Sequence, residues 1–179
     1  MATTPTVEEM LKRVARFKGL KPHKAAFLDH VYAKNVRDIF NIIGRGVSED
    51  LGGPQPDITA VDGFNVQMAG CKPGHGNGLH AHVTVETFLA LNSRWAVRWG
   101  DRAEHEIVLE QFDLVSVPPG VMRCFENIGT EYGYLMAILG GTDPGRLTWH
   151  PQLLRDATEN GWELDANGDI VKEGRIVKG

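Results

Sequence analysis

The segment from Gly78 to Glu86, GLHAHVTVE, constrains the fold and chemistry of this chain more than any other. It is rich in β-branched and apolar residues, which predicts a β-strand. Side chains alternate between the faces of a strand, so positions 80, 82 and 86 would share one face. A lone histidine there would be an ordinary solvent-facing residue. Two imidazoles and one carboxylate in phase, from His80, His82 and Glu86, favour a site for a divalent transition metal.

Length and composition indicate a single globular domain. The chain has 179 residues, of which 42% are hydrophobic and 23% are charged. That is enough for one domain with a core and too little for two ordinary domains. The 21 glycines and 9 prolines favour a turn-rich, all-β architecture. The net charge of −4 argues against nucleic acid as a partner, because phosphate binding requires a basic face.

Other features of the sequence predict a cytoplasmic protein that does not contact a membrane. No apolar run approaches the roughly 20 residues that a membrane-spanning helix needs. The first residues, Met1 to Pro5, lack the basic and apolar regions of a signal peptide. The two cysteines, Cys71 and Cys124, fit neither a disulfide framework nor a CxxC zinc site. We expect both to be packed as small apolar residues.

Turn signals divide the chain into three parts. Thr6 and Glu9 have capping-box spacing, which predicts a helix over residues 6–18, while residues 24–43 fit either a helix or, near their end, a strand. Short strands separated by turns then continue to about residue 141, and predict a sandwich or barrel. These strands are expected at 64–68, 80–88, 95–99, 113–117 and 134–139. The tail predicts a helix and a small hairpin, at 151–160 and 162–171.

Two motifs in the strand-rich region resemble those of the cupin superfamily. The first cupin motif has a glycine-rich approach, an HxH pair and a later glutamate. The residues that match it are His80, His82 and Glu86, which we call the ligand cluster. The second has PxG, then a histidine, then an asparagine. The segment from Pro118 to Asn127 matches it except that Arg123 stands in place of the histidine.

The resemblance covers roughly residues 60–140 and implies an all-β fold. That fold is a small antiparallel β-barrel, or double-stranded jelly roll, with a metal in its interior. An eight-stranded barrel has just enough interior for side chains or one small ligand. We therefore expect an N-terminal helical extension and loop at 1–56, a cupin barrel at 57–141, and a C-terminal helix and hairpin at 142–179. Small cupins usually dimerise, so the resemblance also implies a homodimer or a dimer-based oligomer.

The arginine at position 123 leaves three interpretations of the metal site open. Arginine stays protonated and only donates hydrogen bonds, so it cannot replace a histidine ligand. In the first interpretation the ligand cluster holds the metal alone, as in the two-His, one-carboxylate sites of non-haem iron oxygenases. In the second, His75, Gln67 or His105 supplies a fourth ligand. In the third, the metal is lost and Arg123 binds an anionic ligand.

Arg123 and Gln67 are the further residues expected at the site. Arg123 is the candidate catalytic and substrate-binding residue, since a guanidinium can hold a carboxylate or enolate oxygen. The alternatives are a surface arginine, or a pair with Glu86 that competes with the metal. Gln67 would share a strand face with Asn65 and Ala69. A polar inward face is unusual for plain packing, so Gln67 is expected to line the pocket and bind substrate.

For function, the resemblance implies a mononuclear non-haem metal dioxygenase. Its substrate would be a small oxygenated organic molecule, such as a ketone, phenol or hydroxy-acid. Fe(II) is the first expectation for the metal, with Mn, Ni, Zn or Cu as alternatives. The other interpretation is a non-redox cupin, which would be an isomerase, a decarboxylase or a small-molecule or sugar-binding module. The sequence does not separate these two interpretations.

Overall fold

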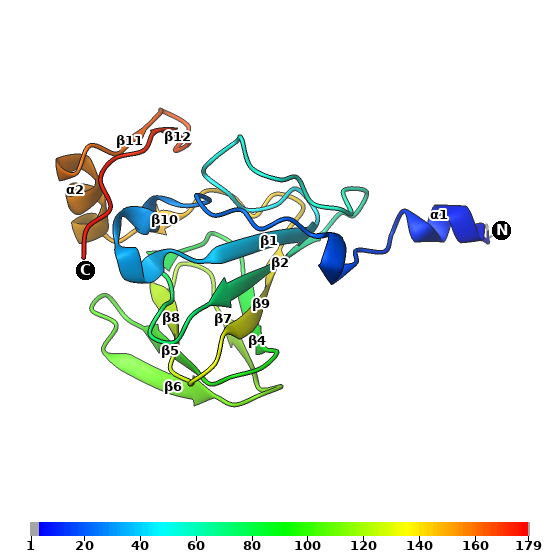
Figure 1. Cartoon of the computed structure of the whole chain (residues 1–179), viewed down its shortest axis with the longest axis horizontal. Helices are drawn as coiled ribbons and strands as arrows, with labels where there is room; N and C mark the ends of the chain where they lie inside the picture. The colour runs from blue at the N-terminus through cyan, green and yellow to red at the C-terminus, as the bar shows by residue number, and fades with distance from the viewer. Residues whose placement is uncertain (1–3, 179) are drawn as a thin grey trace.

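The computed structural model describes residues 4–178 and consists mainly of antiparallel strands (Figure 1). Ten strands form two five-stranded sheets, with the orders β1-β2-β9-β4-β7 and β10-β3-β8-β5-β6. The first sheet contains β1 (Asp38–Ile43), β2 (Phe64–Cys71), β9 (Gly133–Gly140), β4 (Glu86–Ala90) and β7 (Leu114–Val117). The second contains β10 (Thr148–Trp149), β3 (His80–Ala81), β8 (Arg123–Asn127), β5 (Trp95–Trp99) and β6 (His105–Leu109). The all-β class and the jelly roll are thus confirmed.

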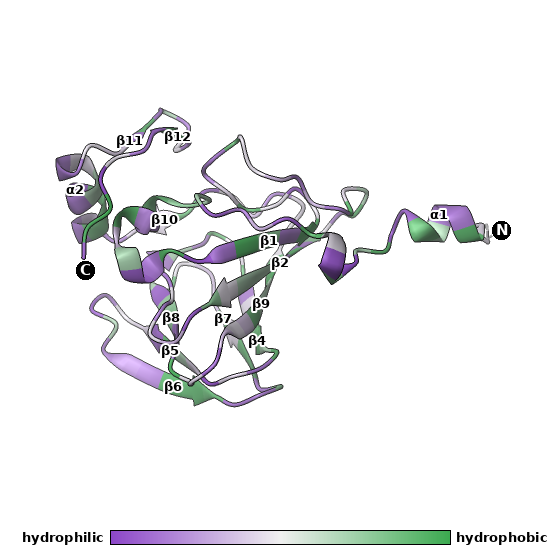
Figure 2. Cartoon of the chain, viewed as in Figure 1, coloured by the Kyte–Doolittle hydropathy of each residue, from purple (hydrophilic) through white to green (hydrophobic). Residues whose placement is uncertain are grey.

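The core lies between the inward faces of the two sheets. The rings of Phe88 on β4 and Phe125 on β8 pack with their centroids 5.5 Å apart, and Trp95 packs on Phe125 at 5.7 Å. Hydrophobic residues recur along these strands (Figure 2). Burial alternates along the whole of β9, as expected for a strand with one face on the core. Trp95 and Val97 on β5 are buried, whereas Trp99 at the end of the strand is only partly buried.

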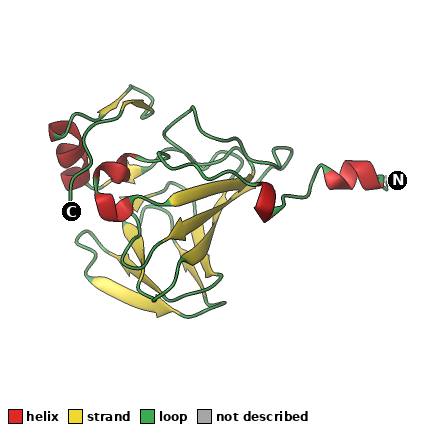
Figure 3. Ribbon diagram, in the orientation of Figure 1, coloured by secondary structure: helices red, strands yellow, loops and turns green. Residues whose placement is uncertain are grey.

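The helix predicted over residues 6–18 is much shorter than expected. Helix α1 spans Val7–Leu11 and begins with the predicted capping box of Thr6 and Glu9. It buries none of its residues, and a helix without tertiary packing is only marginally stable. Short 3₁₀ helices follow, namely η1 (Phe17–Gly19), η2 (Leu28–Val31) and η3 (Ala33–Asn35) (Figure 3). The segment at residues 24–43, which the sequence left open between helix and strand, ends in β1. The strand interpretation is therefore right for the end of that segment.

The C-terminal segment has the predicted helix and hairpin. Helix α2 (Pro151–Glu159) packs against η2 and buries Leu153 and Ala157. The hairpin pairs β11 (Glu163–Leu164) with β12 (Ile170–Lys172). The segments before residue 57 and after residue 141 each add a strand to the jelly roll, β1 and β10 respectively. No helix in the described part of the chain is long and apolar enough to span a membrane. Residues 1–3, where part of the signal-peptide expectation falls, and residue 179 lie outside the described residues.

The strand predicted over residues 80–88 is wrong as a single element. Its first part, His80–Ala81, is β3 in one sheet, and its last part begins β4 in the other sheet. Residues 82–85 cross between the sheets. The sequence hides this crossover, because β-branched residues continue through it. Burial still alternates, since Val83 and Val85 are exposed while His82 is buried.

Candidate metal site

The three residues of the ligand cluster converge between the two sheets. One possible ligand atom from each of His80, His82 and Glu86 lies within 4.8 Å of the others. Each of these residues is only 2% exposed. Strand β3 supplies His80, the crossover supplies His82 and β4 supplies Glu86. The shared direction that the sequence predicted therefore arises because two sheets face each other, not because one strand carries all three residues.

The two histidines are held in the form that can bind a metal. The Nδ1 of His80 lies 2.8 Å from the carbonyl oxygen of Gly78, so its N–H donates there and leaves Nε2 with a free lone pair. The rings of His80 and His82 pack edge to face, with centroids 5.0 Å apart. Burial, assisted by the charge of Arg123, lowers the pKa of His80 well below its usual value and that of His82 to about 3. Neutral imidazole is the metal-binding form.

Arg123 enters the same interior space and pairs with Glu86. It is fully buried, and its Nε and Nη2 donate to Glu86 Oε2 at 3.0 and 2.7 Å. Its Nη1 donates to the carbonyl of Val121 at 3.1 Å. Burial raises the pKa of Glu86, and the charge and hydrogen bonds of Arg123 oppose that rise. The surface-arginine alternative is therefore wrong, and pairing with Glu86 is the arrangement present.

Backbone contacts join the two sequence motifs at the site. His80 and Arg123 are paired across β3 and β8. Gly120, at the turn before β8, has φ +76° and donates its N–H to the carbonyl of His82 at 2.9 Å. Glycine tolerates this left-handed conformation, which suits the PxG position. The motif asparagine, Asn127, donates to the carbonyls of Cys71 and Glu131, so its role is to hold strand ends together.

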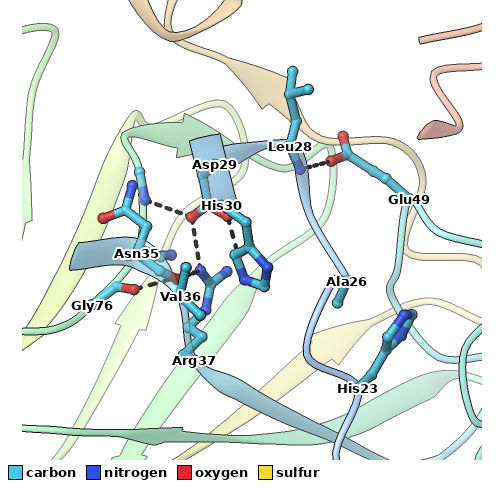
Figure 4. Close-up of polar contacts among 12 residues, drawn as sticks. His23, Ala26, Leu28, Asp29, His30, Asn35, Val36, Arg37, Glu49 and Gly76 are labelled. Carbon is cyan, nitrogen blue, oxygen red and sulfur yellow. Dashed lines mark hydrogen bonds and ion pairs between the residues drawn. The ribbon is translucent and has the colours of Figure 1, made fainter. Parts of the chain in front are cut away.

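A buried ion pair between Asp29 and Arg37 lies next to the site (Figure 4). One oxygen of Asp29 accepts hydrogen bonds from Arg37 Nη1 and from the N–H of Gly78, both at 2.8 Å. The carbonyl of the same Gly78 accepts from His80. Asp29 therefore fixes the residue that sets the ring orientation of a potential ligand. Sequence reasoning missed Asp29 and Arg37, because neither belongs to a motif.

A small cavity of about 20 Å³ adjoins the ligand cluster, roughly enough for one water molecule. Its polar walls include Gln67, Asn77 and Arg37. The buried Oε1 of Gln67 has no hydrogen-bond partner. Gln67 therefore lines the pocket, as its strand face predicted. Arg123 is not among the residues that line this cavity, and it contacts Glu86 from another side.

The other two candidates for a fourth ligand lie outside the cluster. His75 has its Nδ1 3.2 Å from the carbonyl of Val36 and lines a different, surface pocket. His105 is exposed on β6 and packs on Trp99, with ring centroids 5.4 Å apart. Of the three candidates, only Gln67 shares a cavity with the ligand cluster.

No protein family and no curated protein matches the sequence, but solved structures match the fold. A Lactobacillus farciminis oxalate decarboxylase in a formate complex gives a TM-score of 0.56 at 15% identity, covering 78% of this chain and 36% of that one. An oxalate oxidase gives 0.52 at 16% identity, covering 77% and 63%. A cupin superfamily protein from Desulfitobacterium hafniense DCB-2 gives 0.41 at 13% identity, covering 46% and 72%. The chain thus spans about a third of the decarboxylase and less than two thirds of the oxidase. The structural similarity to the decarboxylase and the oxidase shows that this chain has the same fold.

Proposed function

We propose that this chain, which has the cupin fold, binds one divalent transition metal through His80, His82 and Glu86 and acts as a mononuclear non-haem dioxygenase. The observation that carries the proposal is the buried convergence of two neutral imidazoles and one carboxylate. Two histidines and one carboxylate are the facial donor set of non-haem iron oxygenases. Fe(II) is therefore the metal we propose first, with Mn, Ni, Zn and Cu as alternatives.

The pair between Arg123 and Glu86 is compatible with this metal site. Both hydrogen bonds from Arg123 end on Oε2, so Oε1 of Glu86 accepts neither of them. In a metal-bound state, Arg123 would hold the carboxylate in place, as outer partners of metal ligands commonly do. A bound metal would supply Lewis acidity, lowering the pKa of a substrate enol or hydroxyl.

The remaining residues of the cavity suit a small substrate that carries an anionic oxygen. Arg37, which is paired with Asp29, still has an unpartnered Nε donor for such an oxygen. The unpartnered amide oxygen of Gln67 would accept a hydrogen bond from a substrate hydroxyl, and Phe27, Phe125 and Leu135 form apolar walls that exclude water. Because the cavity is small, a substrate requires these side chains to move. Arg123 stays our candidate for the catalytic and substrate-anchoring residue. Arg123 would contact a substrate only after its hydrogen bonds to Glu86 break. Arg37, in contrast, already lines the cavity.

The second candidate is a non-redox cupin, which would be an isomerase, a decarboxylase or a small-molecule-binding module. The observation that favours it is the pairing of Glu86 with Arg123 at 2.7 Å, because this pairing satisfies the carboxylate when no metal is bound. The structurally similar proteins include both an oxidase and a decarboxylase, so the fold does not choose between the two candidates.

Metal analysis of protein purified without chelator tests the proposal. We expect one transition metal per chain, and we expect His82→Ala to lose most of it. His105→Ala, which alters an exposed histidine outside the cluster, is the matched control and should keep its metal. Oxygen uptake should then be screened with catechols, diketones and hydroxy-acids. Iron together with oxygen uptake supports the dioxygenase, and zinc or an empty site supports the non-redox cupin. Full metal content in His82→Ala would show that the site is wrong.

A further inference from the structure

Two residues on the wall of the cavity beside the ligand cluster also reach the protein surface. Fourteen residues line this cavity, and all of them are buried except Asn77 and Leu147, which are partly exposed. A buried wall residue is packed on both sides, so moving it disturbs the core. The route from solvent to the metal site that needs the least rearrangement therefore passes Asn77 or Leu147.

Hydrogen bonds hold Asn77 in place. Its Oδ1 accepts from the N–H of Phe125 at 2.7 Å, and its own N–H donates to the carbonyl of Phe125 at 3.0 Å. Arg37 is also fixed, although it lines both the cavity and a surface pocket. Its Nη1 donates to Asp29 at 2.8 Å within the buried ion pair (Figure 4). Neither Asn77 nor Arg37 can move aside without breaking these contacts.

Leu147 belongs to a segment that is held much more loosely. No backbone hydrogen bond joins residues 143–147 to another segment of the described chain. The segment is tied down through side chains, since Nη1 and Nη2 of Arg146 lie 2.5 and 3.1 Å from the carboxylate oxygens of Asp169. Leu147 itself is apolar and packs partly buried against the core. Its side chain can therefore move without leaving a buried polar group unpaired.

Leu147 also lines a second and larger pocket, which we call the vestibule. Side chains from residues 45–51 and 143–147 border it, and its volume is about 460 Å³, whereas the cavity at the ligand cluster has about 20 Å³. The vestibule and the cavity share two lining residues, Val47 and Leu147. Val47 is buried in the core, only 4% exposed. These two apolar side chains therefore separate the vestibule from the metal site.

We propose that Val47 and Leu147 form a neck through which substrate passes from the vestibule to the ligand cluster, and that Leu147 is the side chain that moves aside. The inference rests on the proposed metal site, because the neck leads to that site. The vestibule carries charges of both signs, among them Arg45, Arg146 and Asp143, so it does not select strongly by charge. The neck is apolar and narrow. It therefore selects substrates by width and, when closed, excludes water from the site.

The rates at which Co²⁺ enters and leaves the ligand cluster test the neck. Visible absorption follows uptake by metal-free protein, and competition with a chelator follows release. Leu147→Ala should raise both rates several-fold, and Leu147→Trp should lower both. Their ratio, the dissociation constant, should not change, because a neck alters passage and not the bound state. Leu164→Ala is the matched control. Leu164 is also partly buried against the core but lines neither space, so its variant should keep the wild-type rates.

A thiol inside the cavity tests the neck without a metal. In a Cys124→Ser background, His82→Cys places a thiol on the cavity wall, and its smaller side chain leaves room for iodoacetamide. Alkylation should be faster with Leu147→Ala, slower with Leu147→Trp and unchanged with Leu164→Ala. This result supports the neck even if the wild-type chain binds no Co²⁺, in which case only the proposed function fails. Alkylation rates that are equal in all these proteins would overturn the neck, and so would Co²⁺ rates that do not depend on Leu147.

Discussion

Arg123 binds Glu86 through a single carboxylate oxygen, with Nε and Nη2 lying 3.0 and 2.7 Å from Oε2. The two side chains are almost fully buried, so solvent does not weaken their attraction as it does at a surface. Oε2 of Glu86 thus accepts both hydrogen bonds from Arg123, and Oε1 accepts neither. This division lets one residue serve as both an ion-pair partner and a metal ligand.

Replacing Arg123 with histidine should strengthen metal binding. Arg123→His restores the residue that the second cupin motif usually has, and it supplies a third imidazole opposite His80. We expect metal affinity to rise by about tenfold or more, measured by competition with a chelator. Turnover should fall, because the added ligand fills a position that substrate or dioxygen needs. Unchanged metal affinity and unchanged turnover would place Arg123 outside the metal site.

Removing the charge of Arg123 should make the fold depend on metal. In Arg123→Met the carboxylate of Glu86 is buried without a cation, which costs roughly 3–5 kcal/mol in the metal-free protein. Added metal should recover much of this loss, because it supplies the missing positive charge. Thermal unfolding with metal and with chelator measures the difference, and the wild-type chain should respond less to either. Equal responses in the two proteins would argue against metal binding at Glu86.

Asp29 should support both the fold and the metal site. In Asp29→Asn the buried Arg37 loses its counter-charge, so we expect a loss of roughly 3–5 kcal/mol in unfolding free energy. The Gly78 N–H, 2.8 Å from the Asp29 carboxylate, keeps only a neutral amide oxygen as its acceptor, so the ring of His80 is held less firmly and metal affinity should fall about 10–100-fold. Urea unfolding and metal competition measure the two effects. Glu110→Gln, in an exposed pair with Arg94, is the control and should change neither. A stable, folded Asp29→Asn variant with wild-type metal affinity would show that Asp29 does not position the site.

The sequence predicts those parts of the molecule that depend on local patterns. Short apolar runs between turn residues give the strands β5 and β9, and the in-phase spacing of His80, His82 and Glu86 gives the ligand cluster. Capping chemistry gives the start of α1 at Thr6. The two motifs give the cupin fold, because their spacing reflects strand and turn lengths. The dioxygenase, the iron and the homodimer stay predictions.

The rest depends on contacts between distant positions. Asp29 reaches Gly78 across 49 residues of sequence, and no periodic pattern marks either partner. The crossover at residues 82–85 looks like strand because its composition is that of a strand. The end of α1 at Leu11 was also missed. The apolar residues after Leu11 recur at helical spacing, but a helix is stable there only if its apolar face packs on another part of the protein.

Glu49 should give the folding stability an unusual pH dependence. Its carboxylate is buried and accepts hydrogen bonds from the N–H of Leu28 at 2.8 Å and from Trp149 Nε1 at 2.7 Å. Burial raises the pKa of Glu49 from 4.5 to about 7. Between these two values the folded chain therefore keeps a proton that the unfolded chain has lost. The folded state binds more protons there, so the contribution of Glu49 to stability falls as pH rises and levels off above pH 7.

The size and the sign of this effect can be isolated with Glu49→Gln. A shift of this size corresponds to at most about 3 kcal/mol. The buried histidines have lowered pKa values and act in the opposite direction, so the variant must be compared with wild type at each pH. In urea unfolding, the stability of Glu49→Gln relative to wild type should rise by up to about 3 kcal/mol between pH 4.5 and pH 7.5. Glu163→Gln, which alters an exposed carboxylate, should show no such trend. A difference for Glu49→Gln that stays constant over this range would mean that the folded chain does not retain the proton on Glu49.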